Sequence, residues 1–288
     1  MLPNVGFKCF TLYNTVLFEQ AKQKPPVTWD ELLAVSKIFS DAGIVPVNIG
    51  SKGGNPGHLL YNVFLSQLGG QPSAEAVAKT FRVSEPVFRD AAKVVKELRE
   101  RKVFPQDSVG NGDWPGSIAL YNNSKAAMVF TCPWMLGQIK PEIARVSEVM
   151  SFPTLKDAKV DGRSFHVGNI NNGWMVNKAS FQDPRKTAAI VSLLDALQSQ
   201  EVRKGLIELG LFPAWKAGDV SSFNINPLAA KVHAFTSQVP QTHAVVAALL
   251  PTPGSLTAYL ESIDRVFAGE NPDEVFENFQ SVVTRERR

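Results

Sequence analysis

The sequence has little of what marks a metal-binding, disulfide-rich or membrane-spanning protein. Cys9 and Cys132 are its only cysteines, and neither lies in a metal-ligand spacing. Two buried free thiols are the favoured interpretation, and a disulfide between them stays open. No stretch approaches the ~18 to 20 apolar residues of a membrane-spanning helix. The opening residues, MLPNVGFKCF, show neither the basic start nor the long apolar stretch of a signal peptide.

The sequence also has no large excess of positive or negative charge. The formal net charge is +3 over 288 residues, and the only basic run is Arg285, Arg287 and Arg288, with Glu286 among them. A nucleic-acid-binding protein is expected to carry a concentrated basic stripe or a recognised module, and the sequence has neither. The terminal run is typical of a solvated helix end, where cations complement the helix dipole. We therefore expect no nucleic-acid partner.

The motifs of common enzyme classes are missing. There is no G-x-S-x-G nucleophile motif, and the four histidines are scattered without a recognisable catalytic or zinc-ligand pattern. The glycine-rich stretch GSKGGNPG (50–57) fits neither the P-loop nor the dinucleotide-binding spacing. We expect no cofactor, no metal and no catalytic activity. A pair of carboxylates, as in a glycoside hydrolase, stays open because sequence alone does not exclude it.

Short apolar strands alternate with helices along the chain, which predicts an α/β fold. Thr28 and Glu31 have capping-box spacing at the start of a helix that ends at Gly43. Asp183-Pro184 and Asn271-Pro272 mark two further helix starts. Strands are expected at 44–50, 126–130, 148–154 and 168–178, and late helices at 227–238, 255–268 and 272–285.

Aromatic rings and amides are what the sequence does offer. Near the expected element boundaries lie Trp29, Trp114, Trp134, Trp174 and Trp215, with Asn14, Asn169, Asn171 and Asn172 close to them in sequence. Flat apolar rings beside amide groups are the chemistry of sugar recognition. This favours binding over catalysis. Two alternatives stay open: a glycoside-active hydrolase with two cleft carboxylates, and an interaction module without a small ligand.

Several segments, in order, resemble one family. They are LYNTVLFEQA…PPVTWDELL (12–33), NNSKAAMVFTCPWMLGQI (122–139), GNINNGWMVNKAS (168–180) and QSQEVRKGLIELGLFPAW (198–215). Together they resemble the family 1 extracellular solute-binding proteins of carbohydrate ABC transporters, the maltose-binding-protein-like group. The resemblance spans essentially the whole chain. Thr15 replaces the family's usual lysine, and Cys132 replaces its usual glycine before Pro-Trp.

The resemblance implies a two-lobed type II periplasmic binding protein fold of α/β class. Residues 1–165 and 226–288 would form lobe 2, and 168–225 would belong to lobe 1, whose first part lies outside this chain together with a signal peptide. The implied function is capture of a mono- or oligosaccharide and its delivery to a membrane permease. The whole protein would be a monomer, periplasmic or lipid-anchored outside the cell. The 168–225 segment is expected to expose apolar faces and to self-associate.

The resemblance also implies sugar-contacting residues. Trp134, in the Pro-Trp pair after a strand, would be a stacking platform at the strand's carboxyl end. Trp29 lies in a capped first turn and is expected to be structural. The other implied contacts are Tyr13, Asn171, Trp174, His58, Trp114 and Ser255.

Overall fold

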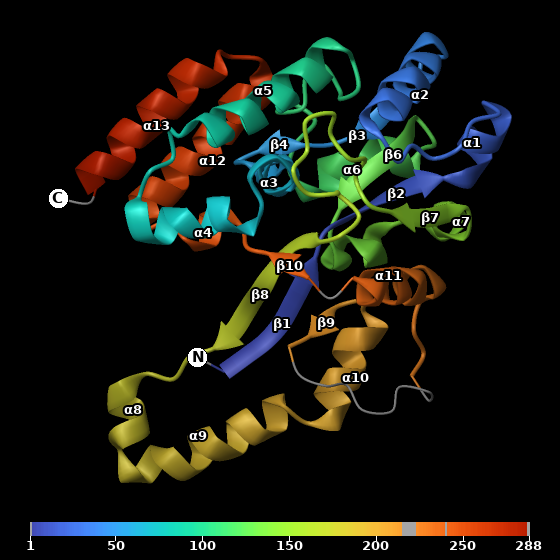
Figure 1. Cartoon of the computed structure of the whole chain (residues 1–288). Helices are drawn as coiled ribbons and strands as arrows, with labels where there is room; N and C mark the ends of the chain where they lie inside the picture. Colours follow the sequence, from blue (N-terminus) through green and yellow to red (C-terminus); the bar gives the residue numbers. More distant parts are fainter. Residues whose placement is uncertain (1, 215–222, 240, 287–288) are drawn as a thin grey trace.

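The computed structural model describes residues 2–214, 223–239 and 241–286, apart from the side chains of residues 170 and 171. Within these ranges the chain forms two four-stranded sheets and a two-stranded hairpin, with helices gathered mainly around one sheet (Figure 1). This confirms the predicted α/β class. None of the helices in these ranges is both long and apolar enough to cross a lipid bilayer.

The larger helical body surrounds what we call the main sheet, with strand order β3-β6-β2-β7. β2 pairs antiparallel with β6 and β7, and β3 lies parallel to β6. Every residue of β6 is buried, which is typical of a strand covered on both faces. The strand bounds are β2 Phe10–Asn14, β3 Val45–Asn48, β6 Ala126–Thr131 and β7 Ser147–Met150.

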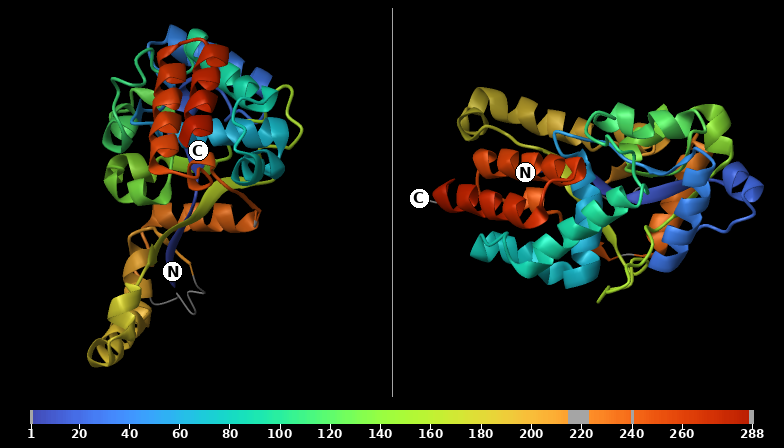
Figure 2. Two further views of the ribbon diagram at one scale, coloured as in Figure 1. Left: turned by 90° about the vertical axis from the view of Figure 1, so that its left-hand side faces the viewer. Right: turned by 90° about the horizontal axis from the view of Figure 1, so that it is seen from above.

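Two hydrophobic cores lie on the two faces of this sheet. Successive side chains of a strand point to opposite faces, and alternate residues of β2, Phe10 and Leu12, join the smaller core. The larger core is built with α1 Thr15–Gln20, α2 Trp29–Asp41, α3 Gly57–Gly69, α4 Gln71–Thr80, α5 Pro86–Glu100, α12 Pro253–Ala268 and α13 Pro272–Glu286. The smaller core is built with α6 Trp114–Asn122, the 3₁₀ helix η1 Pro133–Gln138, α7 Pro141–Arg145 and α11 Pro227–Gln238. In Figure 2, α12 and α13 run side by side at the edge of the body.

Helix α3 runs through the centre of the body. Its residues from Gly57 to Gln67 are all buried, and the buried amides of Asn62 and Gln67 are hydrogen-bonded within the body. It follows a tight hairpin formed by β4 Ser51–Lys52 and β5 Asn55–Pro56, where a plain loop was expected. Gly53 and Gly54 make the turn with positive φ angles, a conformation that favours glycine.

The second sheet has the strand order β10-β8-β1-β9. Its antiparallel β1 and β8 form a long ribbon that extends away from the helical body (Figure 1). β1 passes into β2 through Cys9 alone, so the chain changes sheets within one residue. The bounds are β1 Leu2–Lys8, β8 His166–Trp174, β9 Phe212–Pro213 and β10 Thr242–His243.

Three segments that are distant in sequence meet along β8. β1, from the 1–165 range, pairs antiparallel with β8, and β10, from the 226–288 range, pairs parallel with its first two residues. Backbone hydrogen bonding along the two edges of β8 thus joins segments from the expected lobe ranges in one sheet.

The far end of the ribbon carries helices with little cover. α8 Lys178–Gln182 and α9 Pro184–Leu197 contain no buried residue, and α10 Gln200–Glu208 buries only Ile207. Large apolar side chains are exposed along this region, namely Trp174, Met175, Val176, Phe181, Val191, Leu193 and Leu209. Apolar side chains are therefore exposed in the described part of 168–225, and the expected self-association stays a prediction.

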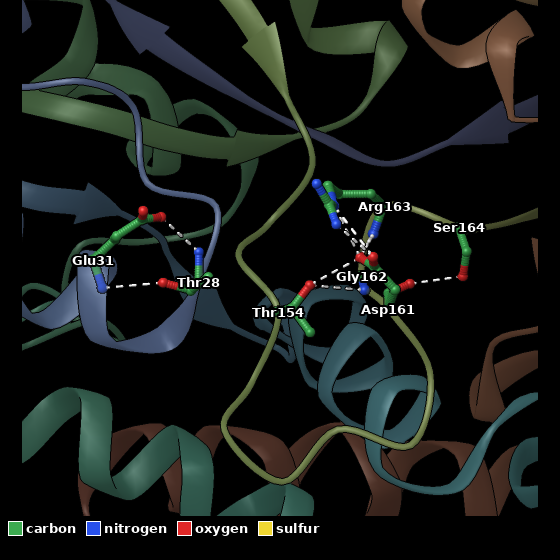
Figure 3. Close-up of polar contacts among 7 residues, drawn as sticks. All are labelled: Thr28, Glu31, Thr154, Asp161, Gly162, Arg163 and Ser164. Atoms are coloured by element: carbon green, nitrogen blue, oxygen red, sulfur yellow. Dashed lines mark hydrogen bonds and ion pairs between the residues drawn. The ribbon is translucent and has the colours of Figure 1, made fainter.

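The loop between β7 and β8 is held against the start of α2 (Figure 3). Thr28 and Glu31 form the predicted capping box, and the Thr154 N–H donates to the Val27 carbonyl at 2.9 Å. The Asp161 carboxylate accepts from the Thr154 hydroxyl at 3.0 Å and from the Arg163 guanidinium at 2.7 Å. The pKa of Asp161 is held well below its usual range, chiefly by Arg163. These contacts fix the path by which the chain enters β8.

Candidate functional site

A cavity of about 490 Å³ lies where the end of the β1–β8 ribbon meets the helical body. This volume is within the range of ~300 to 1000 Å³ typical of small-molecule sites. The cavity is lined from several elements that are distant in sequence. The lining residues are Phe7, Asn55, His58, Leu59, Trp114, Trp134, Asn169, Val245, Ala247, Ala248 and Leu256.

A second cavity of about 440 Å³ lies beside the first. Phe7 and Asn169 line both cavities, and they are register partners on β1 and β8. At this point of the ribbon, the Lys8 ammonium donates to the carbonyls of Thr236 and Val239 at the end of α11, at 2.7 and 2.9 Å. The two cavities are therefore neighbours that share the Phe7–Asn169 pair of the ribbon.

Three aromatic rings form one wall of the first cavity. The Trp134 ring lies 5.3 Å from Phe7, with an interplanar angle of 64°, and 4.9 Å from Trp114, with an angle of 78°. Edge-to-face packing of this kind fixes ring orientation and leaves ring faces available for other contacts. Trp134 directly follows the buried strand β6 in η1, so its predicted place at the strand's carboxyl end is confirmed.

Polar groups of the cavity are neutral. Asn55 and Asn169 contribute amides, and His58 contributes an imidazole. Burial lowers the pKa of His58 to about 4, so the ring is uncharged at pH 7. Its Nδ1 atom is buried and has no hydrogen-bond partner among the described residues. An uncharged wall of rings and amides suits an uncharged, hydroxyl-rich ligand.

Acidic groups are absent from the described lining of this cavity. Elsewhere in the described ranges, no group of three or more His, Cys, Asp or Glu residues could hold a metal ion.

The structure thus brings together three of the predicted contacts, Trp134, Trp114 and His58. Trp29, expected to be structural, is 8% exposed and belongs to the larger core.

Tyr13 is placed away from the cavity. It lies on β2 opposite Met128, and its ring packs 5.4 Å from Phe18. Because β2 is antiparallel to β6, the end of β2 lies near the start of β6, whereas Trp134 follows the end of β6. Burial and the negative charge of Glu148 raise the pKa of Tyr13. The structure gives Tyr13 a packing role.

The remaining predicted contacts do not line the cavity either. Ser255 is fully buried, and its hydroxyl is engaged in the capping box with Thr252 at the start of α12. Trp174 stands at the far end of β8, opposite Leu2 and 39% exposed. The side chain of Asn171 and the whole of Trp215 lie outside the described residues.

Sequence reasoning did not single out Phe7, Asn55 or Leu256. A sequence signal was available for Phe7, because Val5 and Phe7 alternate with Gly6 and Lys8, as in a half-buried strand. Leu256 is the immediate neighbour of the predicted Ser255. Asn55 lies in the glycine-rich stretch, and no local signal distinguishes its amide from those of other loop residues.

Solved structures with a similar fold are numerous. A chitin oligosaccharide binding protein superimposes with a TM-score of 0.83 at 20% identity, covering 100% of this chain and 72% of its own. A maltose-bound MalE3 from T. maritima gives 0.74 at 18% identity, covering 99% and 72%. RafE in complex with raffinose gives 0.72 at 17% identity, covering 99% and 73%. At these identities the likeness establishes the two-lobed fold.

Comparison with curated protein sequences gives no match. In contrast, residues 8–204 match the family described as bacterial extracellular solute-binding protein. The match covers more than half of the chain, so the protein belongs to the bacterial extracellular solute-binding proteins, which are secreted or periplasmic binding proteins and not enzymes.

Proposed function

We propose that the chain is the carbohydrate-binding subunit of an ABC importer. It takes up a mono- or oligosaccharide in the cavity of about 490 Å³ and presents it to a membrane permease. The observation that carries this proposal is the wall formed by Phe7, Trp134 and Trp114, facing two amides and a neutral imidazole.

The chemistry of this wall matches a sugar in two ways. The C–H faces of a pyranose ring are apolar and stack on aromatic rings, and the indoles of Trp114 and Trp134 are such rings in the lining. Hydroxyl groups both donate and accept, so the amides of Asn55 and Asn169 can bond either way. The similar structures include proteins described with chitin oligosaccharide, maltose and raffinose, which supports the same class of ligand.

The position of the cavity supports a closing motion on the ligand. It lies at the junction where β1 passes into β2 through Cys9, so rotation about this junction would change its width. A ligand that contacts residues on both sides would favour the closed state by population shift. We assign the main-sheet body to lobe 2, and the β1–β8 ribbon with α8, α9 and α10 to lobe 1.

Interaction with a permease places the working protein outside the cytoplasmic membrane, free in a periplasm or held by a lipid anchor. In this setting the whole protein would act as a monomer. Asn171 and Trp174, farther along β8, would meet the ligand only if it extends along the ribbon; Tyr13 and Ser255 are not included in the proposed site.

The test is a titration of intrinsic tryptophan fluorescence with maltose, raffinose and chitin oligosaccharides. We expect a saturable change with at least one sugar, and a ~10- to 100-fold weaker affinity in Trp134→Ala, since burying a large apolar side chain contributes about 1.5 to 3 kcal/mol and about 1.4 kcal/mol is tenfold in affinity. Trp174→Ala is the matched control with maltose, the shortest sugar of the panel, because it removes the same fluorophore at a position outside the cavity that only a ligand extending along the ribbon would reach. Equal affinities of the two variants, or no response to any sugar, would contradict the proposed site.

A further inference from the structure

The two cysteines, 123 positions apart in sequence, meet in the fold. Cys9 is the single residue between β1 and β2, and Cys132 directly follows β6. In the β2–β6 pair, Phe10 lies opposite Thr131, and one further step in this register sets Cys9 opposite Cys132. Their Sγ atoms are 2.8 Å apart, so the two side chains point at each other with no atom between them.

The backbone around the pair suits a cross-link. The Cys9 N–H donates to the Val167 carbonyl at 2.8 Å, and the Cys132 carbonyl accepts from the Met135 N–H at 3.1 Å. Neither of these two backbone groups bonds to the opposite cysteine. The pair therefore resembles a non-hydrogen-bonded position of an antiparallel ladder. Such positions bring opposite Cα atoms to about 4.5 Å, within the range of about 4.4 to 6.8 Å found for disulfides.

We propose that Cys9 and Cys132 are joined by a disulfide in the mature protein. The proposal goes beyond solute binding, and it does not depend on which solute is bound. Extracellular and periplasmic compartments sustain disulfides, and the family of this chain is extracellular. Sequence alone favoured free thiols, because it does not reveal that the two side chains face each other.

The reaction requires an oxidant, which we take to be a disulfide of a thiol oxidoreductase or of a small thiol. One cysteine thiolate attacks a sulfur of that disulfide, forming a mixed disulfide and releasing one oxidant thiol. The second cysteine thiolate attacks the cysteine sulfur of the mixed disulfide, forming the Sγ–Sγ bond and releasing the other oxidant thiol. Two electrons pass to the oxidant. The two protons lost by the cysteine thiols are matched by the two protons taken up by the thiols of the reduced oxidant.

Burial sets when this reaction takes place. Cys9 is 4% exposed and Cys132 is 0% exposed, so an oxidant reaches them only before the core closes. Burial and the neighbouring thiol raise the pKa of Cys132, which makes its thiolate scarce in the folded protein. The bond would therefore form during folding and then be shielded from reductants.

The bond would tie together two parts of the candidate site. Cys9 marks the point where the chain changes sheets, and Cys132 lies two residues before Trp134. A cross-link here fixes the base of the Trp134 wall to the junction with the ribbon. It also closes a long loop, which restricts the unfolded chain and thereby stabilises the folded state.

Peptide mapping tests the bond directly. The full chain is prepared by export to an oxidising compartment or refolded with oxidised and reduced glutathione, then unfolded and alkylated without reductant. We expect no alkylated cysteine and one cross-linked peptide pair that holds both residues. Cys9→Ser serves as the control, because its Cys132 must then be alkylated. Alkylation of both cysteines in the unreduced wild type, or cross-links only between chains, would overturn the proposal.

Thermal unfolding tests the structural role. Reduction should lower the Tm of the wild type by roughly 5 to 15 °C. The Cys9→Ser/Cys132→Ser double variant should be insensitive to reductant and melt near the reduced wild type. A wild-type Tm that does not change on complete reduction would refute a stabilising cross-link, whatever the sugar titrations show.

Discussion

Acidification from pH 7 to pH 5 should destabilise the protein, to a large extent through His58. Burial lowers the pKa of this histidine to about 4 in the folded state, whereas its pKa in the unfolded chain is about 6.5. The unfolded state therefore binds more protons than the folded state between these two values. By linkage, stability falls as the pH drops through this window and is fully retained above it.

The size of the effect follows from the two pKa values. Linkage between a folded pKa of about 4 and an unfolded pKa of about 6.5 gives a loss of about 2 kcal/mol from pH 7 to pH 5. His166 acts in the same direction, because burial and the positive charge of Lys8 lower its pKa to about 4. The pKa of His233 is lowered by burial as well, which adds to the loss.

The assay is urea unfolding of the wild type and of His58→Gln at pH 7 and pH 5. The variant lacks the titrating ring, so its loss of free energy of unfolding should be about 2 kcal/mol smaller than that of the wild type. NMR titration of the His58 imidazole provides the independent check. An identical loss in both proteins, or a folded His58 that titrates near pH 6.5, would refute the reasoning.

Two further predictions concern local contacts. Thr28→Ala removes the hydroxyl of the capping box and should lower the free energy of unfolding, measured in urea, by about 1 kcal/mol. Thr28→Ser keeps the hydroxyl and should retain most of this stability. Equal losses in the two variants would contradict the capping role. Leu193→Glu replaces a side chain that is 59% exposed on α9 and should reduce self-association in analytical ultracentrifugation. Ser192→Glu adds the same charge at a neighbouring exposed position, and an equal effect there would show that charge, not apolar surface, controls association.

Helix ends were well predicted because their signals are local. Thr28 and Asp183 cap their helices as expected, and Gly43, Gly210 and Gly269 adopt positive φ angles at helix ends. The exceptions also have local causes. Helix α5 begins at Pro86 with Glu85 as its N-cap, although the preceding Ser84 is of a type more common at that position, and the residues after Cys132 form a 3₁₀ helix. Proline is tolerated at the first position of an α-helix and of a 3₁₀ helix. The sequence does not reveal which of the two helix types follows it.

The candidate site was predicted only in part, because it is assembled from distant segments. Trp134, Trp114 and His58 converge as the resemblance implied. Tyr13 does not lie with them. The pairing of β2 with β6 decides which end of β2 lies near Trp134, and the residues around Tyr13 do not reveal that pairing. The alternation around Phe7 is typical of a strand, but its place in the cavity wall depends on the pairing of β1 with β8, which the sequence does not reveal.

Helix α3 gives this molecule an internal reference for hydrogen exchange. Its residues from Gly57 to Gln67 are buried on every side, whereas α8 and α9 bury none of theirs. Amides enclosed in this way exchange with solvent only when the whole body opens, while amides of poorly covered helices exchange through local fraying. A single deuterium-labelling experiment would therefore report global stability from α3 and local opening from α9, in one sample under the same conditions.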